Sequence, residues 1–393
     1  PLFTTRTGTA KSNPFFADAN GFAQFYAAPG LYRITATSAG TGTTMTWRNV
    51  RLVDVATNAE AIAGTDNQLA VTPAGVKAQV SAVAPSFYIV DQLRAAVEAE
   101  SGGMQTVIYT AKKQPCIMDI IPRFNMEDIP GFTAGTGTHP AFVFNGVAKS
   151  EIMVAAFQAS EIAGEAISRA GLVPRVNINY DQALAKCKAN GAGWDMMSNW
   201  DWAALSLWCM ANGFQPRGNT NYGRHHDNRW ETGRLQDNGI PGDSGGAGRI
   251  LTGTGPNQWR HNNAANGISD LVGNVWEWVT GFKIVDNIAH VQPDNGELAE
   301  ASYLNTSYAL GGNGTFATRP NTGAPDILKQ ALIVPNGAAD PDGYFYITAT
   351  GERLPIRGGA RHYGANAGLG ALYLVNARTG AGSDIGFRPV FRN

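Results

Sequence analysis

Apolar and polar residues alternate along the first 60 residues of this 393-residue chain, between glycine and proline positions. In the run 31–37 the apolar residues fall on one face, and Met45 and Trp47 repeat the same spacing. Val50 continues the alternation after a slip of one residue, which indicates a β-bulge. A period of two residues bounded by turn residues predicts strands. We therefore expect residues 1–60 to form a small β-rich domain.

A helical pattern replaces this alternation further along the chain. Thr72 and Pro73 resemble a helix N-cap followed by proline at the first helical position. Apolar residues then recur at steps of four and three, with Arg94 in the one polar slot, at Val76, Val80, Val83, Phe87, Val90 and Val97. These steps form a heptad pattern, which Pro85 is expected to divide into two short helices. Residues 61–103 are thus predicted to be a linker with a short helical oligomerisation segment. The alternative is a helix that packs on its own domain.

The remaining chain, residues 104–393, is rich in tryptophan, glycine and asparagine. Its periodicity predicts two helices among short strands and long loops. One helix is expected over residues 180–190 and the other over residues 198–212, where Ser198 and Asp201 match a capping box. A glycine follows each of these segments directly, as expected at a helix C-terminus.

Composition narrows the class of protein. The 47 glycines and the low charged fraction of 16% favour a loop-rich, largely β protein. A formal net charge of −1 gives no basic surface for nucleic acid, and no run reaches the ~18 apolar residues of a membrane span. Cys116, Cys187 and Cys209 are widely spaced and are interpreted as reduced core residues, which fits folding in a bacterial cytoplasm. No secretory signal is recognised, and the start at Pro1 suggests processing or a longer parent chain.

Three segments carry a resemblance to a known family. They are residues 193–204 (GWDMMSNWDWAA), residues 267–278 (GISDLVGNVWEW), and Arg357 with two glycines, followed by residues 385–389 (IGFRP). Together they resemble the C-type lectin fold in its formylglycine-generating-enzyme variety, over residues 104–393. The resemblance implies an α+β chain in which a C-type-lectin-like head follows the small β-rich domain and the helical segment.

The second of these segments can also be interpreted physically. Trp276 and Trp278 alternate around Glu277, which predicts a strand with two buried rings. A buried carboxylate needs donors or a cation, so Glu277 is interpreted as a structural anchor with Arg388 as its partner. In the enzyme relatives this neighbourhood can hold calcium, and Asn274 and Glu277 match that pattern. We favour the alternative, a hydrogen-bonded core, and predict no metal and no other cofactor.

Three catalytic interpretations fail on the residues. Formylglycine-generating enzymes need two cysteines near the C-terminal motif to bind copper, and residues 357–393 contain none. Residues 242–246 (GDSGG) match the loop around the serine of chymotrypsin-like proteases, but no upstream histidine has the matching context. They are interpreted as a glycine-rich surface loop. His225, His226 and Asp227 lack further metal ligands at useful spacing and are expected to be solvated. We predict that the protein is not an enzyme.

Receptor recognition is predicted to lie in the segment between Gly359 and Ile385, which separates the two elements of the C-terminal motif. Leu372 and Leu374 alternate with Tyr373 and Val375, so that one pair should face the core and the other should face outward. The stretch resembles the variable region of proteins diversified by retroelements, in which adenine replacement in asparagine codons gives the residue types found here. The predicted receptor-binding residues are Ala360, Arg361, His362, Tyr363, Gly370, Tyr373, Val375, Thr379, Gly380, Ala381, Gly382, Ser383 and Asp384. The alternative is that these are ordinary surface residues.

The front of the chain, around residues 7–32 and 63–76, resembles bacteriophage tail-fibre modules. Such fibres are usually homotrimers, which suits the heptad pattern. The resemblance implies a virion adhesin that is made in the host cytoplasm and binds a receptor on the bacterial surface. This receptor is expected to be a protein, a pilus or a glycan, and the further partners are other tail or baseplate proteins. The alternatives are a surface-polysaccharide depolymerase and a purely structural fibre component.

Overall fold

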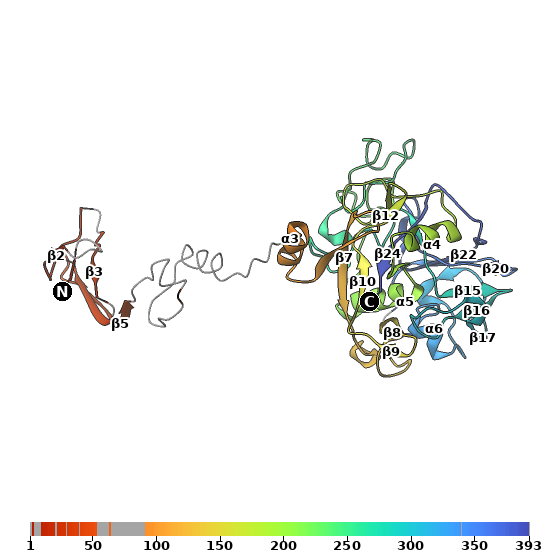
Figure 1. The fold of residues 1–393 in the computed structure, drawn as a ribbon, viewed down its shortest axis with the longest axis horizontal. Coiled ribbons are helices and arrows are strands. Elements are labelled where there is room, and N and C mark those ends of the chain that lie inside the picture. Colours follow the sequence, from red (N-terminus) through yellow and green to blue (C-terminus); the bar gives the residue numbers. More distant parts are fainter. Residues whose placement is uncertain are drawn as a thin grey trace. The chain divides into compact units, whose positions relative to one another are not determined.

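The computed structural model describes residues 2–3, 9–19, 22–28, 30–38, 40–52, 63, 91–338 and 340–392. The chain divides into two compact units, Pro1–Val90 and Asp91–Asn393, which are drawn in Figure 1. Its secondary structure is mixed, with many strands and few helices. None of the helices in the described part of the chain is long and apolar enough to span a membrane. The heptad positions before residue 91 lie outside the described residues.

The described part of the first unit contains two small antiparallel sheets. Strands β1 (Leu2–Phe3), β2 (Ala10–Lys11) and β3 (Tyr26–Ala27) pair in the order β2-β1-β3, and β4 (Gly30–Thr37) forms a hairpin with β5 (Thr44–Leu52). Tyr32 pairs with Val50 and Ile34 pairs with Trp47, so β5 carries one extra residue. The alternation and the bulge predicted for this hairpin are confirmed.

Helix α3 (Gln92–Glu100) opens the second unit and contacts strand β6 (Gln105–Tyr109). The Nε of Arg94 donates a hydrogen bond to the carbonyl oxygen of Val107 at 2.9 Å. Residues 91–103, which we had assigned to the linker, therefore belong to the second unit. Arg94, the polar residue in the heptad pattern, contacts the second unit through this hydrogen bond. The second unit therefore begins at Asp91, earlier in the chain than expected.

The two largest sheets of the second unit have five and six strands. The five-stranded sheet has the order β13 (Trp194–Met196), β24 (Pro389–Phe391), β10 (Glu151–Ala155), β7 (Pro115–Pro122) and β6. The six-stranded sheet has the order β18 (Gly314–Thr315), β19 (Tyr344–Ile347), β22 (Gly368–Leu374), β21 (Ile356–Gly358), β14 (Trp276–Trp278) and β23 (Ile385–Phe387). Arg388 is the single residue between β23 and β24, so the C-terminal motif joins the two sheets.

Smaller elements complete the unit. A four-stranded sheet has the order β17 (Leu304–Ala309), β16 (Ile288–Val291), β15 (Phe282–Val285) and β20 (Glu352–Arg353), and two hairpins consist of β8 (Val143–Phe144) with β9 (Val147–Ala148) and β11 (Ser160–Ile162) with β12 (Glu165–Ile167). The short 3-10 turns are η1 (Met126–Asp128), η2 (Pro140–Phe142), η3 (Asn257–Trp259), η4 (Glu300–Ser302), η5 (Phe316–Thr318) and η6 (Gly364–Asn366).

The described residues contain three further α-helices: α4 (Tyr180–Lys188), α5 (Asn199–Ala211) and α6 (Asp326–Gln330). The first two confirm the predicted helices. Ser198 caps α5, and its side chain and that of Asp201 form the expected capping box. Almost every side chain of α5 is buried, so this helix is the centre around which the second unit packs.

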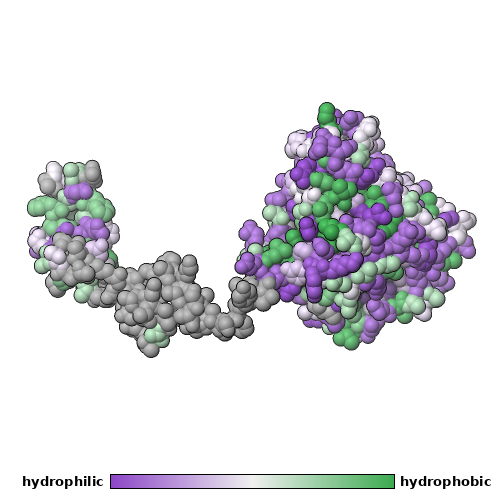
Figure 2. All heavy atoms as spheres, turned by 45° about the horizontal axis from the view of Figure 1, so that its top comes forward, coloured by the Kyte–Doolittle hydropathy of each residue, from purple (hydrophilic) through white to green (hydrophobic). Residues whose placement is uncertain are grey.

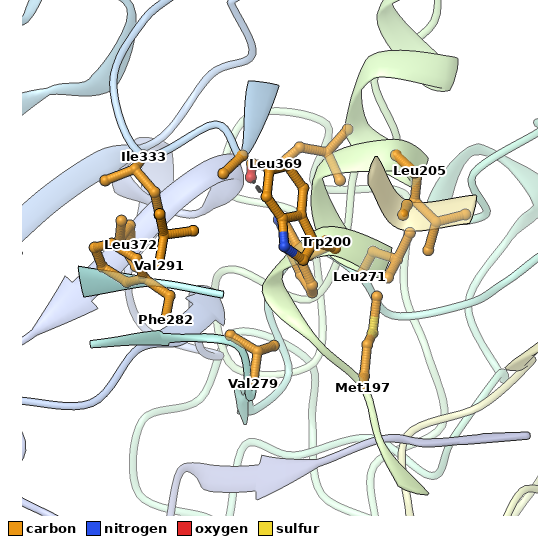
Figure 3. Packing of buried hydrophobic residues seen from close by; sticks show 14 of the residues in the cluster. Met197, Trp200, Leu205, Leu271, Val279, Phe282, Val291, Ile333, Leu369 and Leu372 are labelled. Atoms are coloured by element: carbon orange, nitrogen blue, oxygen red, sulfur yellow. Dashed lines mark hydrogen bonds between the residues drawn. The ribbon is translucent and has the colours of Figure 1, made fainter. Parts of the chain in front are cut away.

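The main hydrophobic core surrounds α5. Figure 3 shows Trp200 and Leu205 of this helix in one cluster with side chains from distant parts of the sequence: Leu271 lies beside Leu205, and Phe282 and Leu372 lie on the other side of Trp200. The indole of Trp202 donates a hydrogen bond to the carbonyl oxygen of Leu369 at 2.8 Å, which ties the helix to β22. All three cysteines are free and buried, which confirms their interpretation as reduced core residues.

Candidate functional site

The floor of the candidate site is held by a buried ion pair. Glu277, between the two tryptophans of β14, accepts hydrogen bonds from Arg388 Nε at 2.9 Å and from Nη2 at 2.7 Å. The two side chains are 1% and 0% exposed. Arg388 also donates to the carbonyl oxygens of Ala155 and Ser269. The structural role predicted for Glu277 and its partner is confirmed, and β14 of the six-stranded sheet is thereby tied to β10 of the five-stranded sheet.

The neighbouring asparagine belongs to the same hydrogen-bonded core. Asn274 Oδ1 accepts from the backbone N–H of Ile250 at 2.9 Å and from Asn219 Nδ2 at 3.2 Å. Its Nδ2 donates to Gln158 Oε1 at 2.9 Å, and Gln158 Nε2 donates to Glu277 Oε1 at 3.0 Å. The side-chain oxygens considered for calcium are therefore hydrogen bonded to protein groups, as in the alternative that we favoured.

Strand β22 turns two kinds of side chain in opposite directions. Leu372 and Leu374 are 0% exposed, whereas Tyr373 and Val375 are partly buried. The predicted alternation is confirmed. Because β19 runs parallel to β22 and pairs Tyr346 with Tyr373, a second tyrosine lies next to the first on the same face of the sheet.

These residues form part of a group of aromatic rings that we call the tyrosine cluster: Tyr346, Tyr363 and Tyr373 around Trp276. The ring centroids of Tyr363 and Tyr373 lie 5.0 and 5.5 Å from that of Trp276. Tyr346 lies 5.2 Å from Tyr373 and 5.9 Å from Tyr363. Trp276 is 1% exposed while the three tyrosines are partly exposed, so a buried indole supports a partly exposed aromatic surface.

Burial also sets the protonation state of the tyrosine cluster. It raises the pKa of Tyr363 to about 12 and raises the pKa values of Tyr346 and Tyr373. The carboxylate of Asp384 adds to this effect for Tyr363 and Tyr373. Each hydroxyl therefore stays protonated at neutral pH and can both donate and accept hydrogen bonds.

A polar rim adjoins the tyrosine cluster. The imidazole of His362 lies 4.7 Å from the ring of Tyr363 and stacks at 6.2 Å on that of Tyr222. Its Nε2 is 3.9 Å from Asp384 Oδ2. Burial lowers the pKa of His362, and the opposing pull of Asp384 is smaller. The imidazole is therefore neutral at pH 7.

Two arginines extend this rim. Arg249 Nη1 donates to the carbonyl oxygen of Ser383. Burial lowers the pKa of Arg249, and the positive charge of Arg361 lowers it further. The contacts of this rim thus join His362 to Asp384 and Arg249 to Ser383.

Two of the predicted binding residues are not accessible. Ala360 is 0% exposed and packs in the core with Trp276, and Gly370 is buried and donates its backbone N–H to the carbonyl oxygen of Asp342. Their assignment to the receptor-binding surface was wrong. Both were included because of their residue type, and residue type does not determine burial.

Backbone hydrogen bonds join residues 378 and 382 to residues 180 and 177, at the start of helix α4. Arg378 accepts from the backbone N–H of Tyr180, and Gly382 accepts from that of Asn177. Within the described chain, no hydrogen bond, ion pair or ring contact joins the predicted residues of this stretch to the tyrosine cluster; they are Thr379, Gly380, Ala381 and Gly382. The binding surface supported by contacts is consequently smaller than predicted.

The long loops before β14 present a different surface. Trp230 and Ile240 are 79% and 75% exposed, and residues 243–246 of the glycine-rich loop are also exposed, as predicted. Figure 2 shows hydrophobic residues gathered in patches on a mostly hydrophilic face of the second unit. The prediction for His225 was wrong, because its residue is only 7% exposed. In the described part of the chain, no three His, Cys, Asp or Glu side chains are grouped as metal ligands would be.

No protein-family model and no curated protein matches the chain. Among solved structures, it is similar to Treponema denticola variable protein 1, with 13% identity over 74% of this chain and 99% of that one, at a TM-score of 0.32. It is also similar to PvdO from Pseudomonas aeruginosa, with 14% identity over 73% and 98% of the two chains, at 0.32. The Major Tropism Determinant M1 variant matches at 13% identity over 72% and 65%, at 0.29. At these TM-scores the likeness is too distant to support a functional inference.

Proposed function

We propose that the chain is a bacteriophage tail-fibre adhesin whose C-type-lectin-like head binds a receptor on the bacterial surface through the tyrosine cluster and its polar rim. The observation that carries the proposal is the tyrosine cluster itself. Two partly exposed, protonated tyrosines on neighbouring strands, Tyr346 and Tyr373, and a third in the loop before β22, Tyr363, present aromatic area and hydroxyl groups together. Tyrosine supplies large, rigid contact area at low entropic cost and is enriched at recognition surfaces.

The scaffold beneath the tyrosine cluster supports this role. Binding residues are most effective when neighbouring groups hold them in place. Trp276 lies under the tyrosines, and the adjacent Glu277 is fixed by Arg388 in a fully buried ion pair. The side chains can therefore meet a receptor without a large loss of conformational entropy.

The proposal assigns no catalysis to the chain. The copper chemistry of the enzymes that the motifs resemble needs accessible thiolates. Burial raises the pKa of the Cys116 thiol to about 12 and that of Cys187 well above its ordinary value. Burial likewise raises the pKa of Cys209, so the three thiols are suited to packing rather than to metal binding.

We further propose that the fibre is a homotrimer located in the virion. Three heads on one fibre would bind several receptors at once, so that weak single-site binding becomes strong attachment. Sedimentation equilibrium of the full chain checks this point, because a monomer would exclude the arrangement.

Adsorption of the full chain to intact host cells tests the binding surface. The double variant Tyr363→Ala and Tyr373→Ala is expected to lose at least tenfold in affinity, since aromatic anchors at an interface contribute about 2 kcal/mol or more each. Tyr308→Ala is the matched control, because Tyr308 is a partly buried tyrosine in β17. Equal adsorption by all three proteins would refute the placement. Reducing ends released from host polysaccharide would instead show a depolymerase.

A further inference from the structure

A cavity opens beside the tyrosine cluster. Its volume is about 520 Å³, within the roughly 300–1,000 Å³ of small-molecule sites. One wall of the cavity is made by residues 365–368, which follow Tyr363 and Gly364 in the chain. The backbone N–H of Gly364 donates to the carbonyl oxygen of Thr220, which lines the cavity as well. The segment predicted to recognise the receptor therefore also shapes this cavity, through residues that the sequence interpretation did not select.

A histidine presents a fixed hydrogen-bond donor to this cavity. His225 lines it and is only 7% exposed. Its Nδ1 accepts from the backbone N–H groups of Asp227 at 3.2 Å and Asn228 at 3.0 Å. A backbone N–H can only donate, so the ring hydrogen must be on Nε2. Burial lowers the pKa of His225 to about 4, and the imidazole is neutral at pH 7.

The Nε2–H of His225 has no protein partner. No hydrogen bond to it occurs among the described residues, and it is not one of the solvent-excluded polar atoms. Because His225 lines the cavity, this unpaired donor lies at the cavity wall. A nearly buried donor that is left open to a cavity favours a ligand that accepts a hydrogen bond.

Hydrogen-bond acceptors lie on other walls of the same cavity. The backbone of Asp342 is held by Gln215 Oε1, which accepts from its N–H at 2.8 Å, and by the N–H of Gly370. Its carboxylate is exposed and has no hydrogen bond or ion pair within the described chain. The carboxylate of Asp227 is 83% exposed, with one oxygen 3.4 Å from His226 Nε2.

The cation in the cavity wall is already neutralised. Arg217 Nε donates to both carboxylate oxygens of Glu231, at 3.0 and 2.9 Å. The cavity therefore offers neutral donors, among them the fixed Nε2–H of His225, and two carboxylates with free acceptor capacity. An anionic ligand would be repelled by the carboxylates. An ammonium group cannot accept a hydrogen bond from His225. Hydroxyl groups donate and accept, and they match both kinds of group.

We propose that this cavity binds a neutral saccharide unit of the receptor, with one hydroxyl oxygen accepting from His225 Nε2 and others donating to Asp342 and Asp227. The inference rests on the proposed adhesin function and narrows its receptor to a glycan. The tyrosine cluster beside the cavity then contacts the next part of the same ligand.

An array of neutral, anionic and cationic oligosaccharides probes the full chain directly. Wild type is expected to bind neutral members, and free sugar should displace it. Ala365→Trp fills the cavity from an exposed position on its wall and should weaken binding at least tenfold, as should Asp342→Ala. Ala148→Trp introduces the same ring at an exposed position of β9 and should bind like wild type.

Three results would overturn the saccharide assignment: no binding to any neutral member, binding to charged members alone, or unchanged binding by Ala365→Trp. Cell adsorption by the same proteins separates this failure from a failure of the adhesin proposal. If only the Tyr363→Ala and Tyr373→Ala double variant loses adsorption, the adhesin proposal is retained and the saccharide site in the cavity is rejected. If all variants adsorb like wild type, both the adhesin proposal and the saccharide site are rejected.

Discussion

Replacing Glu277 by glutamine tests whether the buried ion pair holds the second unit together. The change keeps the shape of the side chain and removes its charge. The guanidinium of Arg388 then has no counter-charge in a site where the two side chains are 1% and 0% exposed. The new amide nitrogen would also face a donor, because Arg388 and Gln158 both donate to Glu277.

The magnitude follows from the contacts that are lost. Glu277 accepts from Arg388 Nε and Nη2 at 2.9 and 2.7 Å and from Gln158 at 3.0 Å. Breaking a buried pair by removing one partner costs about 3–5 kcal/mol. Arg388 keeps its hydrogen bonds to two backbone carbonyls, those of Ala155 and Ser269. We therefore expect the lower end of this range, about 3 kcal/mol of unfolding free energy.

Urea unfolding at pH 7 measures this change, and fluorescence reports it because Trp276 and Trp278 flank Glu277. The double variant Glu277→Leu with Arg388→Met removes both charges and should be more stable than Glu277→Gln, since no buried charge is left unpaired. A loss below about 1 kcal/mol in Glu277→Gln would contradict the structural role. A double variant that is less stable than Glu277→Gln would contradict the electrostatic explanation.

Three further outcomes are expected. Gly273→Ala should lower the free energy of unfolding by about 2–4 kcal/mol in urea, because its Cβ would lie 2.1 Å from the carbonyl oxygen of Asn219 at a φ of +75°. Gly311→Ala has the same φ in open space and should lower it by only about 1 kcal/mol. Burial lowers the pKa of His139 to about 4, so the unfolded state binds more protons between pH 6.5 and 4, and stability should fall as pH falls through that window by about 2–3 kcal/mol. Urea unfolding at pH 7.5 and 4.5 should show a smaller pH effect in His139→Asn, and an equal effect would refute the assignment. Iodoacetamide should label Cys116 and the other two cysteines in urea but not in the native protein, as mass spectrometry would show.

Sequence patterns predicted those parts of the fold that are local in the chain. The period of two found β4 and its bulged partner, and the capping box of Ser198 and Asp201 marked the start of α5. The order of the six-stranded sheet could not be predicted. Strands such as β21 (Ile356–Gly358) are three residues long and buried throughout, so they show no alternation. Their neighbours in the sheet come from distant positions in the chain.

The candidate site was predicted only in part for a related reason. Tyr373 was found because it alternates with buried leucines, but Tyr346 was missed although Phe345 beside it is buried and gives the same signal. Only the parallel pairing of β19 with β22 brings these two tyrosines together. Gly370 was wrongly included, since a Cβ there would lie 2.6 Å from the carbonyl oxygen of Pro341, a contact that the sequence does not reveal.

The structure also limits how freely the proposed binding surface can vary. Leu372 and Leu374 can stay fixed while Tyr373 changes, because the two leucines face one side of β22 and Tyr373 faces the other. Tyr373 contacts Trp276 and packs against one of the larger core clusters, whereas Tyr363 contacts Trp276 and packs against both. Its substitution removes core contacts along with binding contacts, so stability and recognition are coupled at this residue. Variants at exposed Ser383 should retain wild-type stability, whereas Tyr363→Ala should lose about 2 kcal/mol or more, in proportion to the aromatic packing it removes. Equal stability of the two variants in urea unfolding would show that Tyr363 is a binding residue alone.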